Sequence, residues 1–150
     1  MVVFERTASP LSELDIKRVE DRLGVRLPQD LKEHYLLHNG GRPRPRFFVK
    51  DGEAYDVDCF YSMNTGARGS SFEQIYVMMV DQTPEFLRGY IPFADDPSGD
   101  MYVYSVRPES FGNIAIYIHD RYEDDDRKVE FLAPTLREFI ESLTEEPDAL

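Results

Sequence analysis

The spacing of apolar residues changes along the chain, and this change restricts the fold more than any other feature. Up to about residue 40, apolar side chains recur every three or four positions, as on one face of a helix. From Arg46 they alternate with polar side chains, as along a strand, and the helical spacing returns in the middle and at the end. Separate runs of helix and strand predict an α+β fold with a mainly antiparallel, curved sheet. The length of 150 residues suits a single domain, 1–150.

Two helices are predicted near the N-terminus from the residues at their ends. Ser12 is a suitable N-cap, and Asp15 three positions later completes a capping box. Gly24 is typical of the residue that ends a helix. A second helix is predicted from Pro28, which suits a first turn, to the Asn-Gly-Gly stop at 39–41. Together they form a predicted helical hairpin.

Capping boxes also mark a middle helix and a C-terminal helix. Ser70 and Glu73 have the spacing of such a box, and so do Thr135 and Glu138. The predicted helices cover 71–80 and 134–143, and the predicted strands cover 46–50, 55–63, 90–94, 101–106, 112–120 and 129–132. The core of the domain is therefore expected over about 12–143, with frayed termini.

The alternation predicts which side chains share a face of the sheet. Ile114, Ile116 and Ile118 are expected to face the core, which places Tyr117 and His119 on the opposite face. The aspartates expected to face water in the earlier alternating segment are Asp56 and Asp58.

The charge of the chain is strongly negative and unevenly distributed. The net charge is −12, from 17 Lys and Arg against 29 Asp and Glu. Residues 1–50 carry 10 basic and 7 acidic side chains, 51–100 carry 2 and 10, and 101–150 carry 5 and 12, which gives +3, −8 and −7. Such a surface repels nucleic acid and anionic lipid and attracts a basic protein. The alternative is that the charge only aids solubility.

Three arginines, Arg42, Arg44 and Arg46, precede two phenylalanines and form a small basic cluster. They suit phosphate binding in isolation, but in so acidic a chain a solvated loop is the favoured interpretation. Cys59 is the only cysteine, which excludes an internal disulfide and a cysteine-based zinc cluster. Neither a signal peptide nor a run of bilayer-spanning length is expected. The sequence thus predicts a cytoplasmic protein with no direct nucleic-acid or membrane partner. It does not determine the oligomeric state, for which a monomer is favoured.

The segment IPFADDPSGDMYVY, residues 91–104, gathers Asp95, Asp96 and Asp100 between two apolar runs. These carboxylates are suitable ligands for Ca²⁺ or Mg²⁺, but their spacing matches no calcium loop. Asp, Pro, Ser and Gly also bend chains and bind their own backbone, so a turn between two strands is favoured. No metal or other cofactor is predicted.

No catalytic motif emerges from the reactive side chains. His34 and His38 lie four apart on a helix, yet a third zinc ligand is missing from the sequence around them. Cys59 and His119 are a conceivable nucleophile and base, but nothing in the sequence brings them together. The chain is therefore predicted not to be an enzyme.

Acidic and aromatic residues together indicate a protein-binding surface, because tyrosines rimmed by carboxylates suit an interface with a basic partner. The candidate residues are Asp95, Asp96, Asp100, Glu123, Asp124, Asp125 and Asp126, with Tyr102, Tyr104 and Tyr117 as anchors on the sheet face that the isoleucines do not use. The competing interpretation is that a helix covers this face and the tyrosines belong to the core.

The order of these segments resembles the SUKH superfamily. The shared features are two helices separated by Gly and Leu-Pro, the Asn-Gly-Gly stop, Ile-Pro-Phe-Ala, Gly-Asp, a strand that ends in His, and a closing helix, from about Ser12 to Leu143. The residues that match by position, which look structural, are Leu27, Pro28, Asn39, Gly40, Gly41, Ile91, Pro92, Phe93, Gly99, Asp100 and His119. The chain departs from the family in lacking tryptophan, and 42–70 match nothing.

The resemblance implies an α+β fold and a role, seen across bacterial members, as an immunity protein that binds and neutralises a toxin. Such toxins are often nucleases and therefore basic, which an acidic surface would fit. Two alternatives stay open: an intracellular scaffold or regulator without a toxin partner, as fungal relatives are thought to be, and a metal-dependent hydrolase built on Asp95, Asp96 and Asp100.

Overall fold

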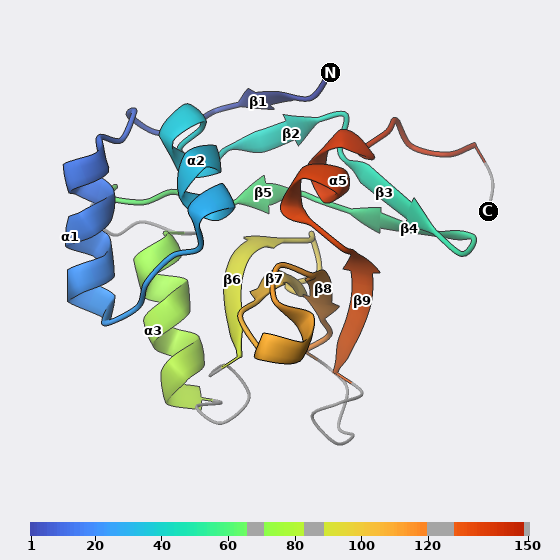
Figure 1. Cartoon of the computed structure of the whole chain (residues 1–150). Helices are drawn as coiled ribbons and strands as arrows, with labels where there is room; N and C mark the ends of the chain where they lie inside the picture. The colour runs from blue at the N-terminus through green and yellow to red at the C-terminus, as the bar shows by residue number, and fades with distance from the viewer. Residues whose placement is uncertain (66–70, 83–88, 120–127, 149–150) are drawn as a thin grey trace.

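The computed structural model describes residues 1–65, 71–82, 89–119 and 128–148, and it shows an α+β fold (Figure 1). The helices are α1 (Glu13–Leu23), α2 (Gln29–Leu37), α3 (Phe72–Gln82) and α5 (Leu136–Glu141), with a short 3₁₀ helix η1 (Pro108–Ser110). The strands are β1 (Val3–Glu5), β2 (Arg42–Arg44), β3 (Phe47–Lys50), β4 (Glu53–Asp56), β5 (Cys59–Phe60), β6 (Tyr90–Asp95), β7 (Met101–Ser105), β8 (Ile114–Tyr117) and β9 (Val129–Ala133). The predicted fold class is confirmed.

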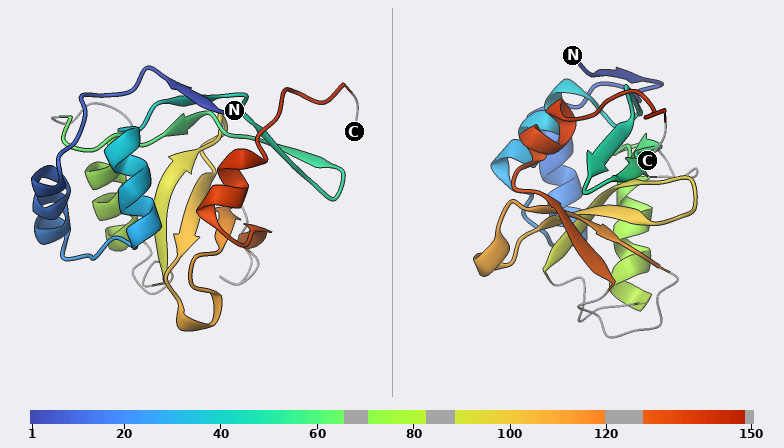
Figure 2. Two further views of the ribbon diagram at one scale, coloured as in Figure 1. Left: turned by 45° about the horizontal axis from the view of Figure 1, so that its top comes forward. Right: turned by 90° about the vertical axis from the view of Figure 1, so that its right-hand side faces the viewer.

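The strands form one main sheet and two small ribbons. The main sheet is antiparallel throughout, in the order β5-β6-β7-β8-β9, and the ribbons pair β1 with β2 and β3 with β4. A bridge between Gly41 and Phe60 connects the β2 ribbon to β5, and a bridge between Phe47 and Thr144 connects β3 to the chain after α5. The β1–β2 ribbon therefore extends the main sheet at β5, and the β3–β4 ribbon is bridged to the chain after α5 (Figure 2).

Local end signals account for the helices, as the sequence predicts. The Ser12 hydroxyl accepts from the Asp15 N–H, the Asp15 carboxylate accepts from the Ser12 N–H, and Gly24 closes α1 in the left-handed region with φ of 68°. The Thr135 hydroxyl caps α5 by accepting from the Glu138 N–H at 3.0 Å. At α3 the predicted cap is wrong by one position, because the Ser71 hydroxyl accepts from the Gln74 N–H at 3.2 Å. Ser70 lies outside the described residues.

The predicted strand over 55–63 is divided between two partners. It pairs with β3 as far as Asp56, and its next residues turn to β6, where the Asp58 N–H donates to the Asp95 carbonyl at 2.9 Å. The alternation of apolar residues continues through this change, so the sequence pattern does not reveal it. The switch brings the end of β4 beside the end of β6.

The assignment of faces in the main sheet is wrong for two of the three tyrosines. Directly opposite residues of antiparallel strands project on the same face. Tyr102 lies opposite Ile116 and Tyr104 opposite Ile114, so both share the isoleucine face. Tyr117 lies opposite Met101 on the other face.

All three of these tyrosines are buried, and the competing core interpretation is correct for them. The Tyr102 ring packs 5.5 Å from the ring of Phe139 in α5, and its hydroxyl donates to the Asp56 carbonyl at 2.8 Å. The Tyr104 hydroxyl donates to the Asp30 carboxylate in α2 at 2.5 Å. Because α2 and α5 cover this face, a partner cannot reach the rings (Figure 2).

Candidate functional site

Asp95 and Asp96 end β6, and a tight turn returns the chain to β7. One Asp96 carboxylate oxygen accepts from the Ser98 N–H at 2.9 Å, the Ser98 hydroxyl at 2.8 Å and the Asp100 N–H at 2.9 Å. Gly99 occupies the left-handed region with φ of 100°. The predicted turn is therefore present, and Asp96 holds it together.

His119 attaches the chain after β8 to this turn. One Asp100 carboxylate oxygen accepts from the His119 N–H at 3.1 Å and lies 2.5 Å from its Nδ1. Gly99 lies next to the imidazole, 3.7 Å from its Cε1 measured from an added Cβ. Two of the residues that match the family pattern, Asp100 and His119, thus meet in one polar contact, and a third, Gly99, lies beside it.

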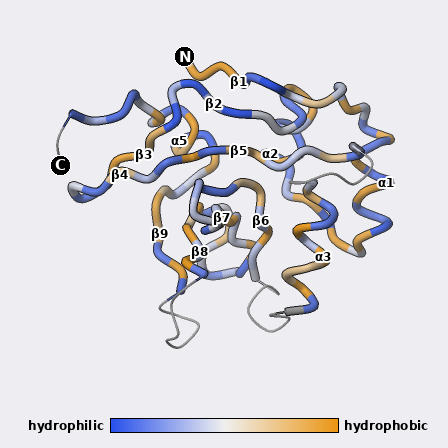
Figure 3. The backbone as a smooth tube through the Cα atoms, turned by 180° about the vertical axis from the view of Figure 1, so that it is seen from behind, coloured by the Kyte–Doolittle hydropathy of each residue, from blue (hydrophilic) through white to orange (hydrophobic). Residues whose placement is uncertain are grey.

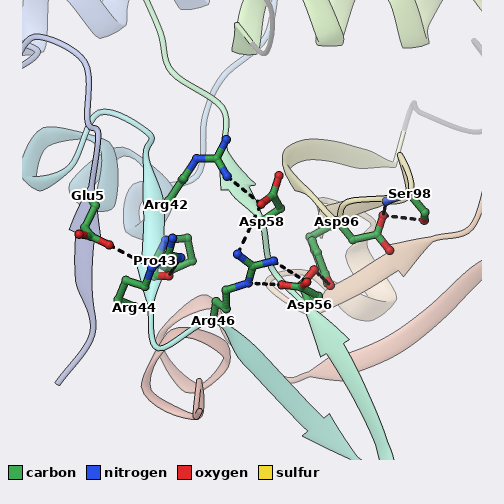
Figure 4. A network of polar contacts seen from close by, with 10 residues as sticks. Glu5, Arg42, Pro43, Arg44, Arg46, Asp56, Asp58, Asp96 and Ser98 are labelled. Atoms are coloured by element: carbon green, nitrogen blue, oxygen red, sulfur yellow. Dashed lines mark hydrogen bonds and ion pairs between the residues drawn. The ribbon is translucent and has the colours of Figure 1, made fainter. Parts of the chain in front are cut away.

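Two arginines from the basic cluster lie on the acidic residues of the divided strand (Figure 4). Arg46 binds the Asp56 carboxylate through two N–H groups, each at 2.6 Å, and Arg42 binds Asp58 at 2.9 Å. The predicted solvated loop is wrong, because Arg42 lies in β2. Asp56 and Asp58, predicted to face water, are partly exposed, at 25% and 24%, and the arginines cover the rest of their carboxylates.

The turn and the divided strand form one acidic surface. We use this name for Asp56, Asp58, Asp95, Asp96 and Asp100. Two of its five carboxylates are paired with guanidinium groups, Asp58 with Arg42 and Asp56 with Arg46 (Figure 4). The sequence showed the carboxylates and the arginines, but their pairing across 10 and 16 positions depends on the tertiary fold.

Asp95 is the least compensated member of the acidic surface. Burial, and next the negative charges of Asp58 and Asp96, raise the pKa of its carboxyl to about 7, while Arg42 opposes them. Within the described ranges its carboxyl makes no ion pair within 4.0 Å. A half-buried carboxyl near neutral pKa is an uncommon state at a surface and is typical of functional positions.

The other candidate residues divide into two groups. Glu123, Asp124, Asp125 and Asp126 lie outside the described residues. The reactive side chains do not form a site: the Cys59 thiol donates to the Phe60 carbonyl at 3.4 Å, and burial raises its pKa, which disfavours the thiolate. His119 is engaged by Asp100.

His34 is buried among aromatic rings rather than placed at a ligand site. Phe4 of β1 and Phe60 of β5 lie 5.1 and 5.2 Å from its ring, and His38 lies 5.6 Å away. Burial, and next the charge of His38, lowers the His34 pKa to about 4, and its Nε2 has no partner in the described part of the chain. Across the described ranges, no group of three or more His, Cys, Asp or Glu is arranged to hold a metal ion.

The Asn-Gly-Gly segment joins three parts of the chain. The Asn39 amide donates to the carbonyls of Ser9 and Met63, at 2.8 and 2.9 Å, and its oxygen accepts from the Met63 N–H at 2.8 Å. A Cβ on Gly40 would lie 2.8 Å from the Ser62 Cα, and Gly40 has φ of 72°. Only glycine fits this approach without strain.

The remaining residues of the family pattern support the core. Leu27 is buried, and its N–H donates to the Glu20 carboxylate at 2.8 Å, while Pro28 is the N-cap of α2. Ile91 and Phe93 are buried in β6, and Pro92 lies opposite Val103 beside a β-bulge. Gly41 forms the bridge to Phe60.

These observations define a class first: a single-domain α+β protein with an acidic surface at one end of an antiparallel sheet. Within that class, the chain belongs to the SMI1 / KNR4 family (SUKH-1), whose family model matches residues 10–142. The resemblance read from the sequence motifs is thereby confirmed. Comparison with curated proteins finds no match. No helix of the described residues has both the length and the apolar composition needed to cross a membrane.

Proposed function

We propose that this protein is a non-catalytic immunity protein that binds and neutralises a toxin domain through the acidic surface. Membership of the SUKH-1 family is compatible with this role. The observation that carries the proposal is Asp95, a half-buried carboxyl between two other carboxylates. A partner that places a Lys or Arg beside it removes this repulsion, so binding gains energy that the free protein lacks. A basic toxin of the nuclease type has the matching charge.

The basic partner is expected to lower the pKa of Asp95. Free Asp95 has a pKa of about 7, so it is partly protonated at neutral pH. A cation beside it favours the ionised form, and complex formation therefore releases a proton. Calorimetric titration in buffers of different ionisation enthalpy measures this release directly.

The first experiment titrates the full chain with the toxin-like domain encoded beside its gene, at low and at high salt. We expect a one-to-one complex whose association rate falls with salt, because the long-range attraction is screened. Asp95→Asn should weaken binding by about tenfold or more and abolish the proton release. Glu141→Gln on α5, which removes an exposed carboxylate far along the chain, is the matched control and should leave affinity unchanged.

Two outcomes would change the proposal. Binding that is tight but equal for wild type and Asp95→Asn would remove the acidic surface from the interface. No binding to a folded, active toxin domain would favour an intracellular scaffold or regulator, and capture of endogenous partners from host lysate would follow.

The acidic segment 123–126 is a second proposed contact. Charge reversal at Asp124, Asp125 and Asp126 should slow association with a basic toxin more than it accelerates dissociation, because long-range charge attraction acts mainly on encounter. Stopped-flow kinetics separates the two rates. Unchanged association would exclude this segment from the interface.

A further inference from the structure

The two-stranded ribbon of β1 and β2 has one apolar side and one basic side. Opposite residues in such a ribbon project together, and the sides alternate along each strand. The pairs are Val3 with Arg44, Phe4 with Pro43, and Glu5 with Arg42. Phe4 packs 5.0 Å from the ring of Phe60, so its side faces the core. The arginines are therefore on the outer side, and β2 is hydrophilic along its length (Figure 3).

This outer side contains a hollow of about 340 Å³ that is lined by Glu5, Arg6, Arg42 and Arg44. Its lining contains three arginines and one glutamate, in a chain where 29 acidic side chains outnumber 17 basic ones. Glu5 and Arg44 lie apart from the turn at Asp96, and Arg42 lies between them with its guanidinium on Asp58 (Figure 4). The hollow is thus a basic region in a protein whose net charge is negative.

Most of the N–H groups in the hollow are not used by the protein. A guanidinium has five N–H donors. Arg44 uses two positions, for the Glu5 carboxylate at 3.0 Å and the Pro43 carbonyl at 2.9 Å, and Arg42 uses Nη1 for Asp58. Arg6 makes no ion pair within the described ranges. Its backbone has φ of 55°, a conformation that a residue other than glycine adopts at a cost of about 1 kcal/mol.

We propose that this hollow binds an oxyanion of the phosphate or sulfate type. Convergent guanidinium groups bind such anions with paired N–H bonds, which lysines do not match in geometry. In the free protein the Glu5 carboxylate binds Nε of Arg44, so it competes with the ligand for that guanidinium group. The site does not depend on the proposed toxin-binding function, because Glu5, Arg6 and Arg44 are not part of the acidic surface and the charge of the hollow is opposite. Arg42 is shared between the two regions through its contact with Asp58.

The experiment follows the arginine Nε resonances of the full, ¹⁵N-labelled chain during titration with sodium phosphate, against sodium chloride at matched ionic strength. We expect saturable shifts of Arg6, Arg42 and Arg44 with phosphate, in the millimolar range. Arg6→Gln and Arg44→Gln should each weaken affinity by about tenfold, equivalent to 1.4 kcal/mol. Arg137→Gln, which removes an arginine paired with a glutamate on α5, is the matched control and should change nothing.

Glu5→Gln keeps the proposal testable even if an arginine variant unfolds. It removes the competing carboxylate, so phosphate should bind more tightly. Equal shifts with chloride, or unchanged affinity in both Arg6→Gln and Glu5→Gln, would overturn the site. A parallel titration with phosphoserine separates the sources: binding weaker than inorganic phosphate supports a free anion as ligand, and equal or tighter binding supports the phosphate group of a larger molecule.

Discussion

His34 and Asp95 are both titratable side chains withdrawn from water beside β5, but their surroundings differ completely. His34 lies against Phe60 and Phe4, and the aromatic packing keeps it neutral. Asp95, opposite Cys59, lies at the surface between two carboxylates. The imidazole of His34 is enclosed by aromatic rings, whereas the carboxyl of Asp95 forms no ion pair within the described chain. Burial of His34 is therefore part of the core packing, whereas burial of Asp95 is the basis of the binding role that we propose for it.

The two residues also give opposite dependences of stability on pH. Burial lowers the His34 pKa from 6.5 to about 4, so the unfolded chain binds that proton more tightly than the folded one. Burial raises the Asp95 pKa from 3.8 to about 7, so the folded chain binds that proton more tightly. His34 therefore favours folding at higher pH and Asp95 at lower pH.

The largest expected effect is the loss of stability from His34 in acid. Its contribution is complete above pH 6.5 and falls by about 3 kcal/mol as the pH decreases towards 4. Urea unfolding of wild type and His34→Phe across this range measures it, because the difference between the two cancels the contribution of Asp95. Parallel pH profiles for the two proteins would show that His34 is not protected from protonation.

Phe4→Ala should destabilise the fold by about 2 kcal/mol, because the ring packs on both histidines and on Phe60. It should also open His34 to water and move its pKa back towards 6.5. NMR titration of the imidazole resonances measures the second effect. A pKa that stays near 4 would mean that β1 does not shield His34.

Asp95→Asn should stabilise the free protein although it weakens the proposed complex. Above pH 7 the substitution removes a half-buried charge, and the gain is about 1–2 kcal/mol after allowance for solvent screening. The gain should decrease as the pH falls towards 4, where the carboxyl is already neutral in the folded state. Denaturant unfolding at several pH values tests this, and a loss of stability at neutral pH would contradict the unpaired state of Asp95.

The smallest expected effect concerns a carboxylate that, unlike that of Asp95, is paired with an arginine. Arg46→Gln should cost about 1 kcal/mol, because it removes two short hydrogen bonds to a half-buried Asp56. Arg137→Gln removes an exposed helical pair and should cost less than about 0.5 kcal/mol. Thermal unfolding of both variants measures the two losses of stability. Equal losses would mean that the acidic surface has no more internal support than an ordinary exposed face.

Sequence reasoning succeeded where the relevant contact lies within a few residues. The capping box at Ser12, the cap at Thr135 and the turn at Asp96 each join groups two to four positions apart. It failed where the contact depends on a distant partner. The wrong face for Tyr102, and the unforeseen Arg46–Asp56 pair, both follow from strand pairing that a single sequence does not specify.

The sequence by itself determined the helices, most of the strands and the turn at the end of β6, because caps, glycines and alternation act locally. It also determined the family, through the order of those local signals. Only the tertiary structure decided that β4 gives way to β5 at the edge of β6, that the tyrosines are core residues, and that Asp95 is left without a partner among the described residues. Burial and register are sums over contacts between distant segments, so no local pattern contains them.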